Sequence, residues 1–216
     1  MRAVNVRHLV ATDINSAADM LVDSFLDDQG MVVLFRDQGL AKLHRAMRGW
    51  FLATLDMWLE QKQPMYVAFD GDQLVGVLIA GHTRNTVTGL QQLKWAWRVG
   101  LSCGLTPILR TAQHDAERRA HFKGQAAHIV EFVGVSAKAR GKGVGRQLFH
   151  QFHAKLEKGA TVWLETTRDE NLSIFAKLGY RQCAQSTSLG VRFTQMLKQP
   201  TKEKNITFRV EVEKYK

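Results

Sequence analysis

The chain has 216 residues, of which 45% are hydrophobic and 23% charged, and its formal net charge is +10 at pH 7. This length favours one domain, or one domain with a small appendage, and it can bury a core without disulfide or metal staples. Only Cys103 and Cys183 are present, which excludes a disulfide framework and a cysteine-based zinc site and favours a cytoplasmic location. No apolar run approaches the length of a membrane span, and residues 1–13 lack the apolar stretch of a secretory signal.

The positive charge by itself predicts only that polyanions are attracted at long range. Nucleic acid, anionic lipid and a phosphorylated cofactor all qualify, so charge does not choose among them. The sequence contains no recognisable helix-turn-helix, zinc-finger or aromatic RNA-binding motif, and we therefore expect no nucleic-acid partner.

The first third of the chain predicts two helices and a β-hairpin. Asp13 precedes an amphipathic pattern as a helix cap, and Pro64 ends a second, longer pattern rich in aromatic residues. We expect this aromatic stripe, including Trp50 and Trp58, to pack in the core. The expected elements are a strand over residues 2–9, a helix over 14–25, a helix over 38–61, and a hairpin over 65–69 and 74–80.

Residues 81–127 carry the least regular pattern. Apolar residues keep helical spacing from Leu90 to Leu101, two glycines and Pro107 interrupt the pattern, and a second helix fits residues 107–122. Seven basic and two acidic side chains lie between Arg84 and Lys123. One interpretation is a solvated basic face over a buried side that contains Trp95 and Trp97.

The central stretch predicts a strand, a glycine-rich turn and a helix in direct succession. Residues 128–135 are apolar and β-branched, and a glycine-rich turn follows between Arg140 and Arg146. Glycine leaves backbone N–H groups accessible, and a helix that starts there adds the positive end of its dipole, which suits a phosphate or pyrophosphate. The helical stripe runs to Leu156, and Gly159 is expected to end it. Neither the dinucleotide fingerprint nor a Walker loop is present.

The C-terminal third predicts one more strand, a short helix and a hairpin. The strand covers 161–166, the helix begins at Arg168 or Asp169, and Gly179 is expected to end it. The hairpin comprises residues 181–186 and 191–198. Alternation of apolar and polar residues over 206–213 fits an extra strand, and a partly ordered tail is the competing interpretation.

These blocks resemble the GCN5-related N-acetyltransferase (GNAT) superfamily. Arg140, Gly143 and Gly145 match its Arg/Gln-x-x-Gly-x-Gly/Ala loop behind a Val-x-Val strand, and residues 163–180 resemble its later block of Leu-Glu-Thr, Asn and Phe-Tyr-x-x-Leu-Gly-Phe. The resemblance covers roughly residues 128–180. It implies an α/β (α+β) fold in which a central mixed, mostly antiparallel twisted sheet is flanked by helices on both faces.

The resemblance also implies a domain organisation and an activity. Residues 1–199 would form one GNAT domain, 82–127 a helical insertion or a wall of the acceptor site favouring an anionic group, and 200–216 a C-terminal extension. The implied activity is direct transfer of an acetyl group from acetyl-CoA to a primary amine of a small molecule or peptide. We expect no metal and no membrane partner, and a homodimer is left open. The residues implied in coenzyme A binding are Val133, Gly134, Val135, Arg140, Gly141, Lys142, Gly143, Val144, Gly145, Arg146, Asn171 and Phe175.

Three side chains are candidates for the proton acceptor that such a reaction needs. Glu131 is the first, because a lone carboxylate in an apolar strand is costly unless it is paired or faces a cleft. Pairing with a lysine or arginine is the competing interpretation. His128, with a near-neutral intrinsic pKa, is the second candidate and Glu165 the third. The resemblance assigns the carbonyl oxygen to a backbone N–H within 133–135.

The chain departs from the family pattern at one position. Phe175 stands where the family has a tyrosine that protonates the leaving thiolate. Either water or another group such as Ser173 protonates it, or the enzyme is slow. The alternative function is therefore a catalytically weak acyl-CoA-binding sensor. Tyr180 matches a terminal aromatic position and is expected to pack in the core.

Overall fold

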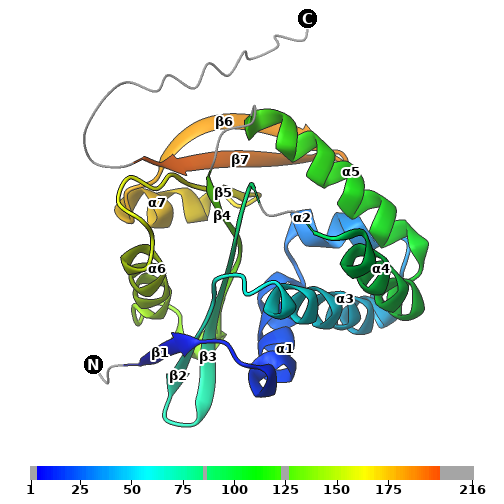
Figure 1. Ribbon diagram of the computed structural model, residues 1–216, viewed down its shortest axis with the longest axis horizontal. Coiled ribbons are helices and arrows are strands. Elements are labelled where there is room, and N and C mark those ends of the chain that lie inside the picture. Colours follow the sequence, from blue (N-terminus) through cyan, green and yellow to red (C-terminus); the bar gives the residue numbers. More distant parts are fainter. Residues whose placement is uncertain (1–3, 85–86, 123–126, 200–216) are drawn as a thin grey trace, which may run out of the picture.

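A computed structural model describes residues 4–84, 87–122 and 127–199, and its centre is a seven-stranded sheet in the order β1-β2-β3-β4-β5-β7-β6 (Figure 1). All neighbouring strands are antiparallel except β4 and β5, which are parallel. This mixed, mostly antiparallel sheet confirms the expected fold class. The strands are β1 (Asn5–His8), β2 (Met65–Asp70), β3 (Gln73–His82), β4 (His128–Val135), β5 (Val162–Thr166), β6 (Arg181–Ser188) and β7 (Val191–Lys198).

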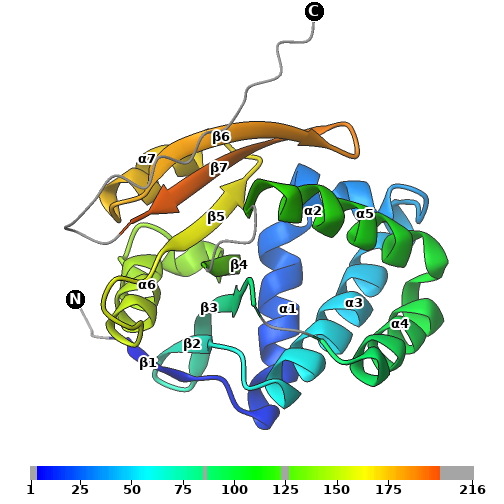
Figure 2. The ribbon, with the colours of Figure 1, turned by 45° about the horizontal axis from the view of Figure 1, so that its top comes forward.

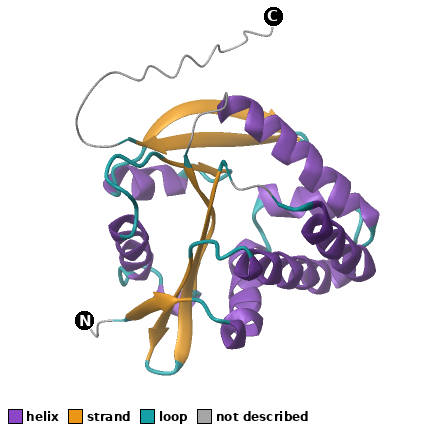
Figure 3. Ribbon diagram, viewed as in Figure 1, coloured by secondary structure: helices purple, strands orange, loops and turns teal. Residues whose placement is uncertain are grey.

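Helices cover both faces of the sheet (Figures 1 and 3). Helices α6 and α7 lie on one face, and α1 to α5 lie on the other. The seven α-helices of the described ranges are α1 (Ile14–Phe25), α2 (Gln29–Val32), α3 (Leu40–Glu60), α4 (Gly89–Cys103), α5 (Leu105–Phe122), α6 (Val144–Ala154) and α7 (Glu170–Lys177). Short 3₁₀ turns are η1 (Ala11–Asp13), η2 (Val33–Phe35) and η3 (Ala137–Ala139).

Strands β2 and β3 are apolar on both faces because helices cover each face of the sheet. Val67 and Val77 point into the core under α1 and α3, whereas Leu78 and Ala80 point into the core under α6. A strand buried on both sides reads as a continuous apolar run rather than an alternation. Gly76 permits the close approach of α6, since a Cβ there would lie 2.8 Å from a methyl group of Val144.

Some element boundaries and the burial of one side chain, Trp97, differ from the sequence predictions. Helix α4 continues through Gly100, because α5 packs beside that glycine, and α5 already begins at Leu105. Helix α6 ends at Ala154 rather than near Gly159, although Leu156 still packs against the core. Trp97 is 68% exposed, so the expectation that it is buried is wrong. The predicted strand over 206–213 lies outside the described residues.

Within the described ranges, no helix combines the length and the apolar character that crossing a bilayer requires.

Candidate functional site

The two parallel strands separate soon after they pair. Three residues of β4, from His128 to Val130, pair with Val162 to Leu164 of β5. Beyond this point β4 continues to pair only with β3, and β5 pairs only with β7. The divergence opens the sheet between the carboxyl ends of β4 and β5, which places backbone and side chains of both strands around one space.

A β-bulge lies at the point where the strands part. Ile79 of β3 pairs with Phe132, and the next residue, Ala80, pairs with Val130, so Glu131 is the extra residue on β4. Bulges re-aim side chains and are frequent beside active sites. The first candidate for the proton acceptor therefore sits on an irregularity of the strand that lines the opening.

The glycine turn adopts the conformation that its sequence predicts. Gly141 and Gly143 have φ values of 74° and 82°, a region that side chains with a Cβ rarely adopt. Gly143 is the N-cap residue of α6, so the N–H groups of the next three residues have no acceptor within the helix. A Cβ added to Gly141 would meet no atom within 4 Å. The turn thus presents bare backbone donors at a positive helix end, which suits a phosphate group.

The glycine turn, the two diverging strands and helices α4 and α5 surround one cavity of about 1430 Å³. Arg140 from the turn, Arg146 from the first turn of α6 and Lys177 from α7 line the cavity and add positive charge to it. Lys142 and His128 are not among the residues that line the cavity. The predicted site residues that do line it are Glu131, Val133, Gly134, Val135, Arg140, Gly141, Gly143, Val144, Gly145, Arg146, Asn171 and Phe175.

A buried ion pair connects Glu131 of β4 to helix α5. Arg118 of α5 donates to its carboxylate, and the two side chains are only 13% and 12% exposed. Arg118 also contacts Asp115 at 2.8 Å. Burial raises the pKa of Glu131 above its usual range, and the guanidinium opposes this rise. Burial disfavours charged Arg118 as well, but the surrounding carboxylates raise its pKa.

A second polar cluster joins His114 to Glu165, the third candidate for the proton acceptor, and to Ser188. The sequence did not predict this cluster. His114 of α5 donates from Nε2 to Glu165 of β5 at 2.8 Å, and its Nδ1 lies 2.9 Å from the hydroxyl of Ser188. A carboxylate only accepts, so the proton on Nε2 of His114 is donated to Glu165. The four-residue spacing of His114 and Arg118 places both on one side of α5, but no sequence signal indicates their partners.

Aromatic rings form another part of the cavity wall. The Trp50 ring lies 5.8 Å from Phe132 and 6.3 Å from Trp95, measured between centroids. Trp50 is only 4% exposed, which confirms its expected place in the core, and it also lines the cavity together with Trp58. Its indole N–H is buried and finds no acceptor among the described residues.

The family's tyrosine position holds a packed ring without a hydroxyl. Phe175 is 7% exposed and lies 5.9 Å from Phe149 and 6.2 Å from Tyr180, measured between ring centroids. Tyr180 is buried as expected, and its hydroxyl lies 2.9 Å from Nε2 of His153. Ser173 is exposed and is not among the cavity-lining residues. No hydroxyl of these side chains therefore lies where the family has its tyrosine.

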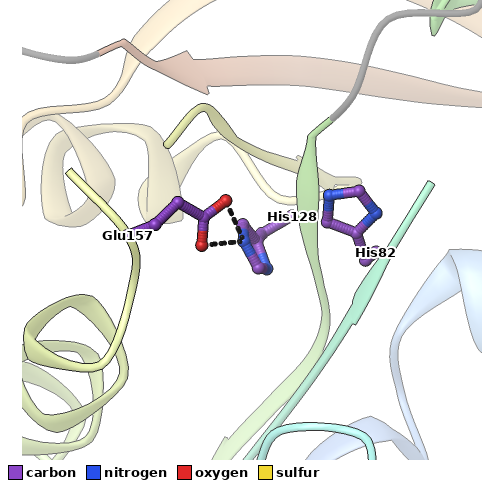
Figure 4. A group of neighbouring side chains, drawn as sticks. All are labelled: His82, His128 and Glu157. Carbon is purple, nitrogen blue, oxygen red and sulfur yellow. Dashed lines mark hydrogen bonds and ion pairs between the residues drawn. The ribbon is translucent and has the colours of Figure 1, made fainter. Parts of the chain in front are cut away.

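His128 lies at the other end of β4 from the glycine turn. It is the first residue of the strand, faces His82 across the β3–β4 pair, and contacts Glu157 at 3.2 Å (Figure 4). Donor atoms of these three side chains all lie within 4.8 Å of one another. Nδ1 of His82 already accepts from the backbone N–H of Arg84 at 3.0 Å. The group is thus a hydrogen-bonded cluster outside the cavity.

The chain belongs to the GNAT acetyltransferase family, since the sequence profile of the acetyltransferase (GNAT) family matches residues 32–180. A Corynebacterium glutamicum structure named histone acetyltransferase HPA2 and related acetyltransferase is 21% identical, with a TM-score of 0.67 over 93% of this chain and 98% of that chain. Arylalkylamine N-acetyltransferase 2 from Aedes aegypti is 12% identical, with a TM-score of 0.60 over 93% and 100%. PH1933 from Pyrococcus horikoshii is 16% identical, with a TM-score of 0.55 over 92% and 99%. No curated protein sequence matches the chain significantly.

Proposed function

We propose that the protein is an acetyl-CoA-dependent N-acetyltransferase that acetylates a primary amine. The observation that carries this proposal is a single cavity that joins the glycine turn to a buried carboxylate at a strand bulge. Residues 1–199 are proposed to form the domain, with 82–127 as an insertion. The two free cysteines support the cytoplasm as the place of action, because unpaired thiols persist in reducing compartments.

The glycine turn is the proposed site of the pyrophosphate. Backbone N–H groups after Gly143 would donate to it, and Arg140 and Arg146 would add positive charge. Val133 and Val135 would flank the pantetheine arm together with Asn171, which also lines the cavity. The fit rests on the open space at the turn and on its positive φ values. Lys142 does not line the cavity, so we assign it no contact there.

Glu131 is the proposed acceptor of the proton that the amine must lose. An alkylamine has a pKa of about 10.4, so it is mostly protonated near neutral pH and cannot attack until it releases a proton. Burial raises the pKa of Glu131, which makes it a better base than an exposed carboxylate. Glu165, held by His114, is the second candidate in the same cavity.

Bound acetyl-CoA would supply an activated thioester carbonyl carbon. The free amine nitrogen forms the new bond to this carbon, the carbon–sulfur bond breaks, and the electron pair leaves with sulfur. A backbone N–H within 133–135 is proposed to stabilise the charge that develops on the carbonyl oxygen. Because Phe175 offers no hydroxyl, we propose that water protonates the thiolate; a thiol pKa of about 8.5 makes this proton transfer helpful rather than essential.

The acceptor is proposed to be an amine with an apolar body. Trp50, Trp95 and Phe132 offer an aromatic wall, while Glu131 and Glu165 offer negative charge for an ammonium group. Arg118, which lines the cavity together with Arg119, is already paired with two carboxylates and is therefore not free to bind an anionic acceptor group. One structural relative from Aedes aegypti is named for arylalkylamines, in line with this proposal.

Binding and turnover are tested separately. Calorimetry with acetyl-CoA should show binding by the wild type. Coenzyme release should then be measured with arylalkylamines, polyamines, amino acids and lysine peptides. Glu131→Gln should lower kcat by about a hundredfold or more and leave acetyl-CoA binding intact. Glu157→Gln, a change at an exposed carboxylate outside the cavity, is the matched control and should leave both unchanged.

A weak acyl-CoA sensor is the second candidate function. Two observations favour it, namely the missing hydroxyl at Phe175 and the ion pair that occupies Glu131. The sensor would bind acetyl-CoA and release no thiol with any amine of the panel. Absence of acetyl-CoA binding would refute both functions.

A further inference from the structure

The insertion helices present a line of large apolar side chains to solvent. Leu90, Leu93, Trp97 and Leu101 recur every three or four residues along α4, and each is at least 68% exposed. The next residues of this kind are on α5, where Leu105 and Leu109 are 72% and 69% exposed. We refer to these six residues as the α4–α5 stripe.

The two halves of the stripe are continuous. A Cβ added to Gly100 would lie 4.0 Å from Cδ2 of Leu105, so the start of α5 packs directly beside α4 at this glycine. Val99 and Cys103, on the opposite side of α4, are buried in the core. The fold therefore uses one face of α4 internally and leaves a second apolar face without a partner among the described residues.

Such a surface is unusual for a free monomer. Patches on monomeric proteins are typically about 300–600 Å², and larger ones mark sites of interaction. Six side chains at these exposures present on the order of 700 Å², close to the ~800 Å² that each partner contributes to a standard interface. Ile174 on α7, 54% exposed, lies outside the stripe on the other face of the sheet.

The charges beside the stripe identify the chemistry of the partner. Lys94 and Arg98, the two cations of α4, form ion pairs with Glu60 and Asp56 of α3. A helix that lies on an anionic membrane keeps its cations for lipid headgroups. Here both are neutralised within the chain, so the flank of the stripe is neutral and favours another apolar protein surface.

We propose that the α4–α5 stripe is a two-fold interface with a second copy of this chain. A two-fold interface uses the same patch on both partners, and a neutral apolar stripe satisfies this requirement with itself. Leu90, Leu93 and Trp97 follow the three- and four-residue spacing of a heptad seam, and Leu101 continues the exposed line one turn later. The α4 and α5 helices of two copies would form a four-helix arrangement.

This dimer would restrain a wall of the acceptor cavity. Helix α4 lies between α3 and α5 (Figure 2). Trp95 and Ile108 line the cavity from α4 and α5, and so do His114 and Arg118. The stripe lies on the solvent side of the same two helices. Dimerisation would therefore hold the wall in place, while the cavity itself remains built from one chain.

Analytical ultracentrifugation of the full-length protein tests the proposal. The wild type should sediment as a dimer at about 100 μM. Trp97→Glu and Leu93→Glu should each weaken the dimer at least about 30-fold, as expected for loss of a central interface residue. Ile174→Glu places the same charge on an exposed apolar position outside the stripe and should leave the dimer intact. Circular dichroism verifies that each variant is folded, and Leu90→Gln is the milder substitution if a charged variant is not.

Three results would overturn the proposal. The first is a wild type that sediments as a monomer at this concentration. The second is a dimer that persists in folded stripe variants. The third is a monomer that co-floats with phosphatidylserine vesicles and loses this binding in Trp97→Glu, which would identify the stripe as a membrane surface.

Discussion

The buried Arg118–Glu131 ion pair should contribute measurably to the free energy of unfolding. Both side chains are nearly buried, at 13% and 12% exposure, so replacing Arg118 by methionine leaves a carboxylate without its cation in the cavity wall. Removing one partner of a buried pair typically costs 3–5 kcal/mol, because the remaining charge is desolvated and unpaired. Asp115, the other partner of Arg118, is 33% exposed and can hydrate, so most of the loss should come from Glu131.

A double variant measures how much of this loss comes from the unpaired Glu131 carboxylate. Arg118→Met with Glu131→Gln removes both charges, and we expect it to recover at least about 2 kcal/mol of the loss in the single variant. Arg192→Met is the matched control. Its pair with Asp169 is exposed on both sides, at 61% and 65%, and its loss should cost less than about 1 kcal/mol.

The pH dependence has a definite sign. Without Arg118, nothing opposes the rise that burial imposes on the pKa of Glu131, so the folded carboxyl binds its proton more tightly than the unfolded one. Stability then falls as pH rises from the unfolded value of about 4.5 through the raised folded value. Urea unfolding of Arg118→Met should show a larger deficit near pH 8 than near pH 5. A loss below about 1 kcal/mol, or an equal loss at both pH values, would refute the reasoning.

Three further predictions concern the turn, the acid stability and the thiolate. Gly143→Ala should weaken acetyl-CoA binding at least about tenfold, whereas Gly190→Ala, with a similar φ of 83° in the β6–β7 turn, should match its 1–2 kcal/mol strain without changing affinity. Burial lowers the pKa of His153 to about 4 from 6.5, so stability should decline as pH falls through this window, and His153→Gln should decline less in thermal melts. Phe175→Tyr should raise kcat by up to about tenfold without changing acetyl-CoA affinity; an unchanged kcat would mean that thiolate protonation does not limit turnover.

The conformation of the glycine turn and the fold class were predictable because their causes are local. Gly141 and Gly143 adopt the positive φ values that this turn requires, because glycine has no Cβ. The helix that starts directly afterwards has free N–H groups at its first turn. The apolar runs of β3 and β4 likewise indicate strands covered on both faces. These local features are what makes the central block, from His128 to Tyr180, resemble the GNAT family.

Packing alone determined what those features face. In the sequence, Glu131 stands out as a lone carboxylate in an apolar strand, but its partner Arg118 lies 13 residues away on α5. The partner of His114, Glu165, lies 51 residues away on β5. The exposed side of Trp97 also depends on which face of α4 meets α3. Backbone preference and periodicity are properties of neighbouring residues, whereas ion pairs and buried faces depend on how distant segments are brought together, which no local pattern encodes.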